Sequence, residues 1–219
     1  MARTQPFEAH TARYEHWFSR HDLAYRSELR ALAPLVGRPA RALEVGVGTG
    51  RFAQPLGIGV GLDPSPQMLE VARRRGIAVV RGVAEALPFG DVAFDLVLVV
   101  TTICFVDDAG HMLREVRRVL VPGGAVVIGF IDRTSRLGRH YETHRQENVF
   151  YRDATFYSAD EVAHLLEDNG FRAHTWTQTL RRPLGEPTEV EVPGPGTGQG
   201  AFVAVRGITP DGGTTRRAG

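Results

Sequence analysis

The sequence predicts a three-layer αβα fold built on a doubly wound, mostly parallel sheet of seven strands. Short apolar runs typical of buried strands recur between amphipathic segments, at residues 42–45, 59–62, 77–80, 94–100 and 125–131. Strands that alternate with helices form parallel sheets covered on both faces. Two later apolar runs, residues 171–180 and 201–206, are joined without a helix. One strand is therefore expected to run antiparallel.

The composition suits one domain with a sizeable core. The chain has 219 residues and a formal net charge of +1, so it has no general attraction to nucleic acid or anionic membranes. No apolar run approaches the ~20 residues of a membrane span, and the N-terminus lacks the apolar core of a signal peptide. The single cysteine, Cys104, excludes an internal disulfide and fits a reducing compartment. We expect a cytoplasmic monomer or homodimer.

The N-terminal region is expected to form one or two amphipathic helices over residues 7–33. Tyr14, Trp17 and Phe18 recur near helical spacing with charged residues between them. Pro34 and then Gly37-Arg38-Pro39 are expected to end this region. These aromatic residues either pack on the sheet or line a pocket, and the pattern alone does not distinguish the two roles.

A glycine-rich turn follows the first strand. Gly46, Gly48 and Gly50 stand at alternate positions, where glycine permits positive φ and close approach of a ligand. The second strand ends on Asp63, which lies 19 positions after Glu44 (63 − 44) and is placed to accept hydrogen bonds from a ribose. The turn reads G-x-G-x-G, so it misses the G-x-G-x-x-G pattern of nicotinamide-dinucleotide sites.

Capping signals predict the starts of the later helices. Residues 51–56 allow only a short helix, whereas Ser65 can cap a longer one. Asp107 or Asp108 can cap the next helix, and a capping box begins at Ser158. The chain is expected to begin with a helical segment that forms a lid, residues 1–36, and to continue with a main domain, residues 37–207. A polar and aromatic insert, residues 132–157, lies within the main domain, and residues 208–219 are expected to form a mobile tail.

The glycine turn and three later segments resemble one enzyme family. The run from Glu44 to Gly50, followed by Asp63, resembles motif I and the second acidic motif of class I S-adenosylmethionine-dependent methyltransferases. The segments VAEALPF, FDLVLVV and LREVRRVLVPGG are also similar to that family, particularly to its small-molecule branch. The resemblance covers roughly residues 14–206. It implies a Rossmann-like fold, S-adenosylmethionine as cofactor, and in-line transfer of its methyl group to a small-molecule acceptor.

The resemblance implies roles for residues at the strand ends. Glu44 would receive the ammonium group of the methionine part and Asp63 the ribose hydroxyls. The family commonly has an acid at the position of Val83, where it binds the adenine amino group, so Ala84 or Glu85 would have to read the base here. The residues expected to bind the cofactor are Glu44, Gly46, Val47, Gly48, Gly50, Asp63, Pro64, Met68, Ala84, Glu85 and Thr101.

The acceptor pocket is expected between the N-terminal helices and the insert, where this family often builds specificity. Its expected residues are Tyr14, Trp17, Phe18, Phe105, His140 and Tyr141. His140 or Tyr141 could serve as a base if one is needed, and no catalytic residue is assigned. His140 and His144 would share a helical face, but they do not form H-E-x-x-H, so no metal site is expected. Cys104 is expected in the pocket wall or core.

Three other functions stay open at this point. The absence of an acid at Val83 and of a clear base leaves room for a non-catalytic nucleoside-binding regulatory module. Methylation of RNA or protein is a second alternative, although the balanced charge and the lack of a separate basic domain argue against nucleic acid. The glycine spacing argues against an NAD-dependent oxidoreductase.

Overall fold

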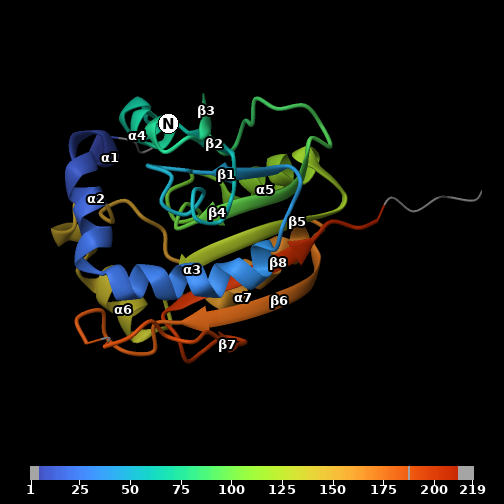
Figure 1. The fold of residues 1–219 in the computed structure, drawn as a ribbon. Coiled ribbons are helices and arrows are strands. Elements are labelled where there is room, and N and C mark those ends of the chain that lie inside the picture. The colour runs from blue at the N-terminus through green and yellow to red at the C-terminus, as the bar shows by residue number, and fades with distance from the viewer. Residues whose placement is uncertain (1–4, 187, 212–219) are drawn as a thin grey trace, which may run out of the picture.

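The computed structural model describes residues 5–186 and 188–211, which form one eight-stranded sheet flanked by helices (Figure 1). The strand order is β3-β2-β1-β4-β5-β8-β6-β7. The strands are β1 (Ala42–Val45), β2 (Val60–Asp63), β3 (Ala78–Arg81), β4 (Phe94–Val100), β5 (Leu120–Ile131), β6 (Arg172–Thr179), β7 (Gly194–Pro195) and β8 (Phe202–Ile208).

The sheet confirms the predicted fold class and adds one short strand. Strands β1 to β5 pair in parallel, and β8 lies antiparallel between β5 and β6. The strand that was not expected is β7, a two-residue segment that pairs antiparallel to β6. It lies in the stretch 183–200 between the last two expected strands. Strands as short as β7 do not produce an apolar pattern in the sequence, because only two side chains contribute.

Helices cover both faces of the sheet, as expected for three layers. They are α1 (Gln5–Ala9), α2 (Thr11–Arg20), α3 (Asp22–Val36), α4 (Pro66–Arg74), α5 (Ala109–Val119), α6 (Arg136–Thr143) and α7 (Ala159–Asp168), with a 3₁₀ turn at Arg145–Glu147. Leu96 and Leu98 of β4 pack in the core beneath α3 and α4, whereas Val97 and Val99 pack beneath α5 and α7. Successive side chains of β4 thus serve opposite layers.

The predicted caps are present. The Ser65 hydroxyl accepts a hydrogen bond from the Met68 amide at the start of α4. Asp108 accepts one from the His111 amide at 2.8 Å and begins α5. At α7 the Ser158 hydroxyl and the Glu161 carboxylate bond each other's backbone amides, which completes the capping box.

Two local expectations were wrong. The N-terminal helical region consists of three helices instead of one or two; α3 includes Pro34 and ends at Val36, where Gly37 caps it. The burial of Leu35 and Val36 in the core offsets the hydrogen bond that proline removes. Residues 51–57 form successive turns and no helix, because Pro55 cannot donate the amide that a helical turn there requires.

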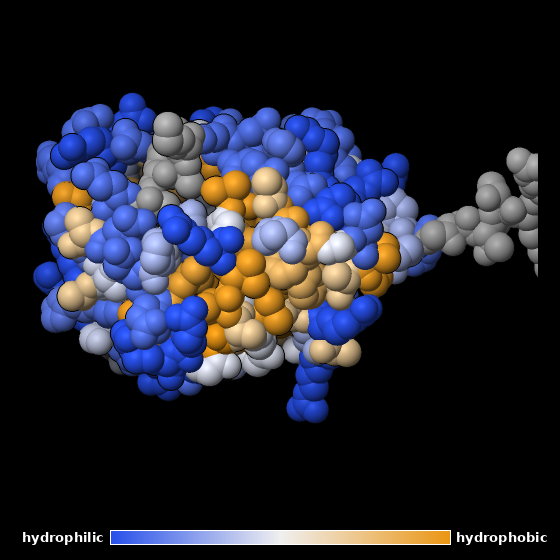
Figure 2. Space-filling model, turned by 90° about the horizontal axis from the view of Figure 1, so that it is seen from above, coloured by the Kyte–Doolittle hydropathy of each residue, from blue (hydrophilic) through white to orange (hydrophobic). Residues whose placement is uncertain are grey.

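The molecular surface is mostly polar, with hydrophobic residues across the middle of the face seen from above (Figure 2). Among the described residues, Val92 and Val192 are the large hydrophobic ones with exposed side chains. Most of the apolar surface in this view is therefore only partly exposed. No described helix is long and apolar enough to cross a membrane. Of the expected tail, residues 212–219 lie outside the described residues.

Candidate functional site

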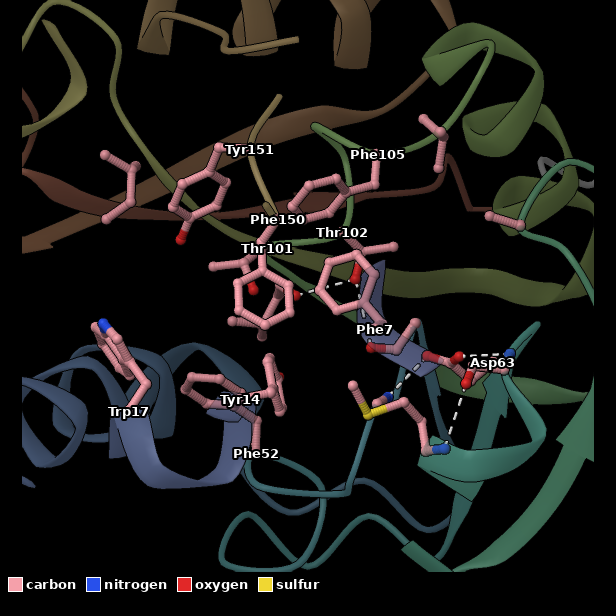
Figure 3. Close-up of a pocket in the computed structure, with 18 of the residues that line it drawn as sticks. Phe7, Tyr14, Trp17, Phe52, Asp63, Thr101, Thr102, Phe105, Phe150 and Tyr151 are labelled. Carbon is pink, nitrogen blue, oxygen red and sulfur yellow. Dashed lines mark hydrogen bonds between the residues drawn. The ribbon is translucent and has the colours of Figure 1, made fainter. Parts of the chain in front are cut away.

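A cavity of about 210 Å³ opens where β1, β2 and β4 end. The carboxyl ends of parallel strands are the usual ligand-binding edge of such sheets. Figure 3 shows the cavity between the strand ends and a cover of aromatic side chains. Gly46 and Gly48 follow β1, Asp63 ends β2, and Thr101 and Thr102 follow β4, and all five line the cavity.

The glycine turn after β1 needs its glycines for different reasons. Gly46, Gly48 and Gly50 have φ of 73°, 51° and 82°, in the region that disfavours residues with a Cβ. A Cβ on Gly46 would overlap the Thr102 side chain, and one on Gly48 would lie 3.3 Å from the Tyr14 hydroxyl. Gly50 packs against Ile77 and does not line the cavity. Gly46 and Gly48 therefore present bare backbone to the cavity, and Gly50 serves packing.

Val47, also expected at the cofactor, lies in the core. Its side chain is 3% exposed and packs against Gly61 of β2. The amide of Val47 donates to the Leu62 carbonyl at 2.9 Å. Val47 thus joins the turn to β2 and lies outside the set of cavity-lining residues.

Glu44 is a buried acid with an unused acceptor. Its side chain is 1% exposed, and Oε2 has no hydrogen-bond partner within the described chain. Burial raises the pKa of Glu44 well above its usual value. The hydrogen bond from the Ala53 amide lowers this pKa in part, and the charge of Asp63, a smaller effect, raises it further. Glu44 does not line the cavity, but its charge acts on Tyr14, which does and which lies against the turn.

Asp63 faces the cavity and also closes the turn. The amides of Gly48 and Ser65 donate to Oδ2 and Oδ1, each at 2.9 Å (Figure 3). Burial raises the pKa of Asp63 to about 6 despite these two bonds. A carboxylate offers about four lone-pair sites. Asp63 therefore keeps acceptor capacity for a ligand in the cavity.

The wall beyond Asp63 is largely apolar. Pro64, Met68, Ala84 and Val83 line it together with Glu85. The Glu85 carboxylate accepts a hydrogen bond from the Asp107 amide at 2.8 Å and a longer one from Asp108. One of its two oxygens, Oε1, is thus used just before the start of α5.

Aromatic side chains from the N-terminal helices and from residues 148–151 cover the cavity. The Phe7 ring lies 5.0 Å from Phe105 and 5.2 Å from Phe150, measured between centroids. Tyr14 packs edge-on against Phe7, and Tyr151 stacks on Phe105. Trp17 and Tyr151 lie at the end of the cavity opposite Asp63 (Figure 3).

Glu15 joins the covering helix α2 to the glycine turn. Its carboxylate accepts hydrogen bonds from Arg51 at 2.6 Å, from Arg75 at 3.1 Å and from the Thr49 hydroxyl. Burial alone would raise the pKa of Glu15, but these bonds lower it to about 2. Because Arg75 also donates to the Thr49 carbonyl, one network links α2, the turn and the end of α4.

The expected acceptor residues are mostly brought together. Tyr14, Trp17, Phe18, Phe105 and Tyr141 line the cavity. His140 does not: it is exposed on α6, stacked on His144, because the helix turns that side chain away from Tyr141's face. Among the described residues, no group of three or more His, Cys, Asp or Glu could hold a metal ion. Cys104 is buried, which raises the pKa of its thiol to about 12.

Several lining residues were not anticipated from the sequence. They are Phe7, Glu28, Phe52, Phe150 and Tyr151. Glu28 could have been found by its spacing, since Ala24 and Leu32, four residues to either side, are both buried. Phe150 and Tyr151 lie in a stretch without periodicity and carry no such signal.

Comparison with known proteins places this geometry in a family. Residues 43–128 match the model of a methyltransferase domain. An uncharacterized protein of Methanocaldococcus jannaschii is 42% identical over 199 residues, covering 91% of this chain and 96% of the relative. A demethylmenaquinone methyltransferase of Tropheryma whipplei is 31% identical, covering 76% and 87%.

A solved structure agrees over nearly the whole chain. The crystal structure of a SAM-dependent methyltransferase from Thermotoga maritima, described as a possible histamine N-methyltransferase, has a TM-score of 0.92 and 46% identity, covering 94% of this chain and 99% of that one. The fold and the glycine turn define a class I methyltransferase. The chain belongs to the S-adenosylmethionine-dependent methyltransferases, and S-adenosylmethionine is its cofactor.

Proposed function

We propose that this enzyme methylates a small molecule held in the covered half of the cavity. The observation that carries the proposal is the aromatic cover itself. Phe7, Tyr14 and Phe150 close over the strand ends, and Trp17 and Tyr151 enclose the far end. A cavity closed in this way suits a ligand that is enclosed as a whole. An RNA or protein acceptor would need an open groove for the rest of its chain.

The two relatives with named activities support the same proposal. The Tropheryma protein is a demethylmenaquinone methyltransferase, and the Thermotoga structure is described as a possible histamine N-methyltransferase. Both names refer to small acceptors. The two acceptors differ greatly in size and polarity. The names therefore support a small-molecule acceptor, and the chemistry of that acceptor has to be argued from the cavity of this protein.

The residues at the strand ends fit the cofactor. The free Oε2 of Glu44 is a buried acceptor suited to an ammonium group, and Asp63 keeps lone pairs for ribose hydroxyls. Gly46 and Gly48 allow the methionine part to approach the backbone. The wall of Pro64, Met68 and Ala84 suits an adenine ring. Glu85 and Thr101 also line the cavity and are the remaining proposed contacts of the cofactor.

The protein's own contribution to the reaction is alignment and exclusion of water. When bound, S-adenosylmethionine supplies a methyl group already activated by its sulfonium. Residues at the carboxyl ends of β1 and β2 hold the donor, and the aromatic end of the cavity orients the acceptor for in-line attack. We include residues 1–36 in the proposal as a lid and 132–157 as the wall that contributes Tyr141, Phe150 and Tyr151.

The lid must move for the cofactor to enter. The cavity volume of about 210 Å³ is below the ~300–1,000 Å³ typical of ligand sites. Tyr14 reaches to the glycine turn and occupies part of the space. Opening of α1 and α2 would free this space, and closure would expel water from the reacting groups.

Calorimetric titration with S-adenosylmethionine and its demethylated product tests the cofactor site. Asp63→Ala is expected to weaken binding more than about tenfold, because two hydrogen-bonded acceptors are lost. Asp168→Ala is the matched control, since this aspartate is exposed at the end of α7. Equal affinity of Asp63→Ala and Asp168→Ala would refute the ribose assignment.

A product assay tests the acceptor class. The protein is incubated with isotopically labelled S-adenosylmethionine and a cell extract separated into small molecules, RNA and protein. We expect label in the small-molecule fraction. Label confined to RNA or protein would contradict the proposal.

A further inference from the structure

The cavity contains an acid for which the cofactor has no use. Glu28, on α3, lines the cavity and is 4% exposed. Within the described chain, no hydrogen-bond donor or cation shifts its pKa; burial alone raises the pKa of Glu28 to about 8. Other carboxylates of the region have partners: Glu15 pairs with two arginines, and Asp63 accepts two amides.

Glu28 belongs to the acceptor end of the cavity. Beyond the effect of burial, its charge raises the pKa of Tyr141 and Tyr151, and Tyr151 lies at the end opposite Asp63 (Figure 3). The charge of Glu28 also raises the pKa of Tyr14, by less than the charges of Glu44, Asp63 and Glu15 do.

The surroundings of Glu28 favour a cation over an anion or a neutral group. An unpaired carboxyl in an apolar wall costs free energy, which a bound cation offsets by forming a charged pair. Trp17, Tyr141 and Tyr151 line the same end, and the faces of such rings attract ammonium groups. An anionic acceptor would instead share the cavity with two acids, Glu28 and Asp63.

We propose that the methyl acceptor is an organic amine whose ammonium group pairs with Glu28 while its apolar part lies against the aromatic wall. This inference rests on the proposed function, since it names the class of small molecule that the cavity receives. The role assigned to Glu28 is recognition of the acceptor's positive charge.

Formation of the pair has a proton balance that can be measured. Near neutral pH the empty site holds a protonated Glu28, so binding of R–NH₃⁺ releases the carboxyl proton to the buffer and leaves a carboxylate–ammonium pair. The tyrosines whose pKa values respond to the charge of Glu28 are Tyr14, Tyr25, Tyr141 and Tyr151, and burial raises the pKa values of all four. They stay neutral between pH 6 and 9 and do not supply the released proton. Comparison with Glu28→Gln separates proton release by Glu28 from that by Glu44 and Asp63, whose pKa values are also raised.

The test compares amines with isosteric alcohols on three proteins. Histamine, 2-phenylethylamine, tryptamine and hexylamine are titrated calorimetrically into protein saturated with S-adenosylhomocysteine, each beside the alcohol that replaces its amino group. The proteins are the wild type, Glu28→Gln and Glu142→Gln. Glu142 is exposed on α6 next to Tyr141 and serves as the matched control.

At least one amine is expected to bind the wild type more than about tenfold more tightly than its alcohol, with release of a proton. Glu28→Gln should abolish this preference and the proton release, and Glu142→Gln should retain both. The proposal is overturned if no amine is preferred over its alcohol, or if Glu28→Gln keeps the preference.

The failure of this inference is distinguishable from failure of the proposed function. Binding of S-adenosylhomocysteine to Glu28→Gln is expected to match the wild type, which also shows that the variant folds. If the wild type binds S-adenosylhomocysteine and methylates a neutral small molecule, the amine assignment falls and the small-molecule function stands. If label appears only in RNA or protein, both fall.

Discussion

The Glu28→Gln variant is expected to be more stable than the wild-type protein at neutral and alkaline pH when no acceptor is bound. Glutamine has nearly the shape of a protonated glutamic acid and cannot ionise. In the unfolded chain Glu28 ionises above its ordinary pKa of 4.5, whereas in the folded protein it keeps its proton up to about pH 8. Between these values the folded state binds the additional proton, so its stability falls as the pH rises.

The size of the effect follows from the two pKa values. With 4.5 for the unfolded chain and about 8 for the folded protein, the wild type loses about 3 kcal/mol by pH 7 and about 4 kcal/mol by pH 8, since each pKa unit corresponds to about 1.4 kcal/mol. Glu28→Gln escapes this loss. A gain in stability that accompanies a loss of ligand recognition is the pattern expected of a functional site.

Urea denaturation of the two proteins at several pH values checks this prediction. The free energies of unfolding should nearly coincide at pH 4.5 and separate progressively up to pH 8, with Glu28→Gln the more stable. Glu142→Gln controls for general effects of removing a carboxylate, since Glu142 is exposed. A difference between wild type and Glu28→Gln that does not change with pH would refute the reasoning.

Three further predictions concern the cofactor half of the cavity. Glu15→Gln should lower the free energy of unfolding at pH 7 by about 1 to 2 kcal/mol and speed release of S-adenosylhomocysteine in stopped-flow measurements, because Arg51 and Arg75 lose their partner at a site that water reaches. The contribution of Glu15 to wild-type stability is present above pH 4.5 and is lost as the pH falls towards 2. An unchanged release rate would contradict the linkage of α2 to the turn. Gly46→Ala should lower the free energy of unfolding by about 2 to 4 kcal/mol in thermal unfolding, since strain at positive φ adds to overlap with Thr102. Gly57→Ala, with the same φ of 73° and open space around it, should lower this free energy by about 1 kcal/mol. Equal losses of stability in the two variants would show that the overlap is relieved. Calorimetric affinity for S-adenosylhomocysteine should fall as the pH drops below about 6, where Asp63 takes up a proton, and a constant affinity between pH 5 and 7 would exclude Asp63 as the ribose acceptor.

The fold was predictable because its signals are local. The caps at Ser65, Asp108 and Ser158 each involve residues within one helical turn, and the apolar run of β4 carries its own burial pattern. Local signals also identify the glycine turn and Asp63, since both lie at strand ends. The exceptions, Pro34 within α3 and the turns at residues 51–57, depend on how neighbouring segments pack.

Much of the site was not predictable because it depends on how distant segments meet. Glu15 and Arg75 are 60 residues apart, and only the packing of α2 on the turn brings them together. The spacing of Glu28 from Ala24 and Leu32 indicates the apolar face of α3, but only the packing of α3 shows that this part of the face reaches the cavity. Phe150 lies in a stretch whose conformation is set by contacts with Phe7 and Tyr14.

Helix α2 has a part in both halves of the cavity. Tyr14 lies against the glycine turn, and Trp17, three residues later, lies at the far end. A rigid element of 10 residues cannot withdraw one of these side chains and leave the other in place. In the lid that we propose, one movement of α2 therefore uncovers the donor end and the acceptor end of the cavity together.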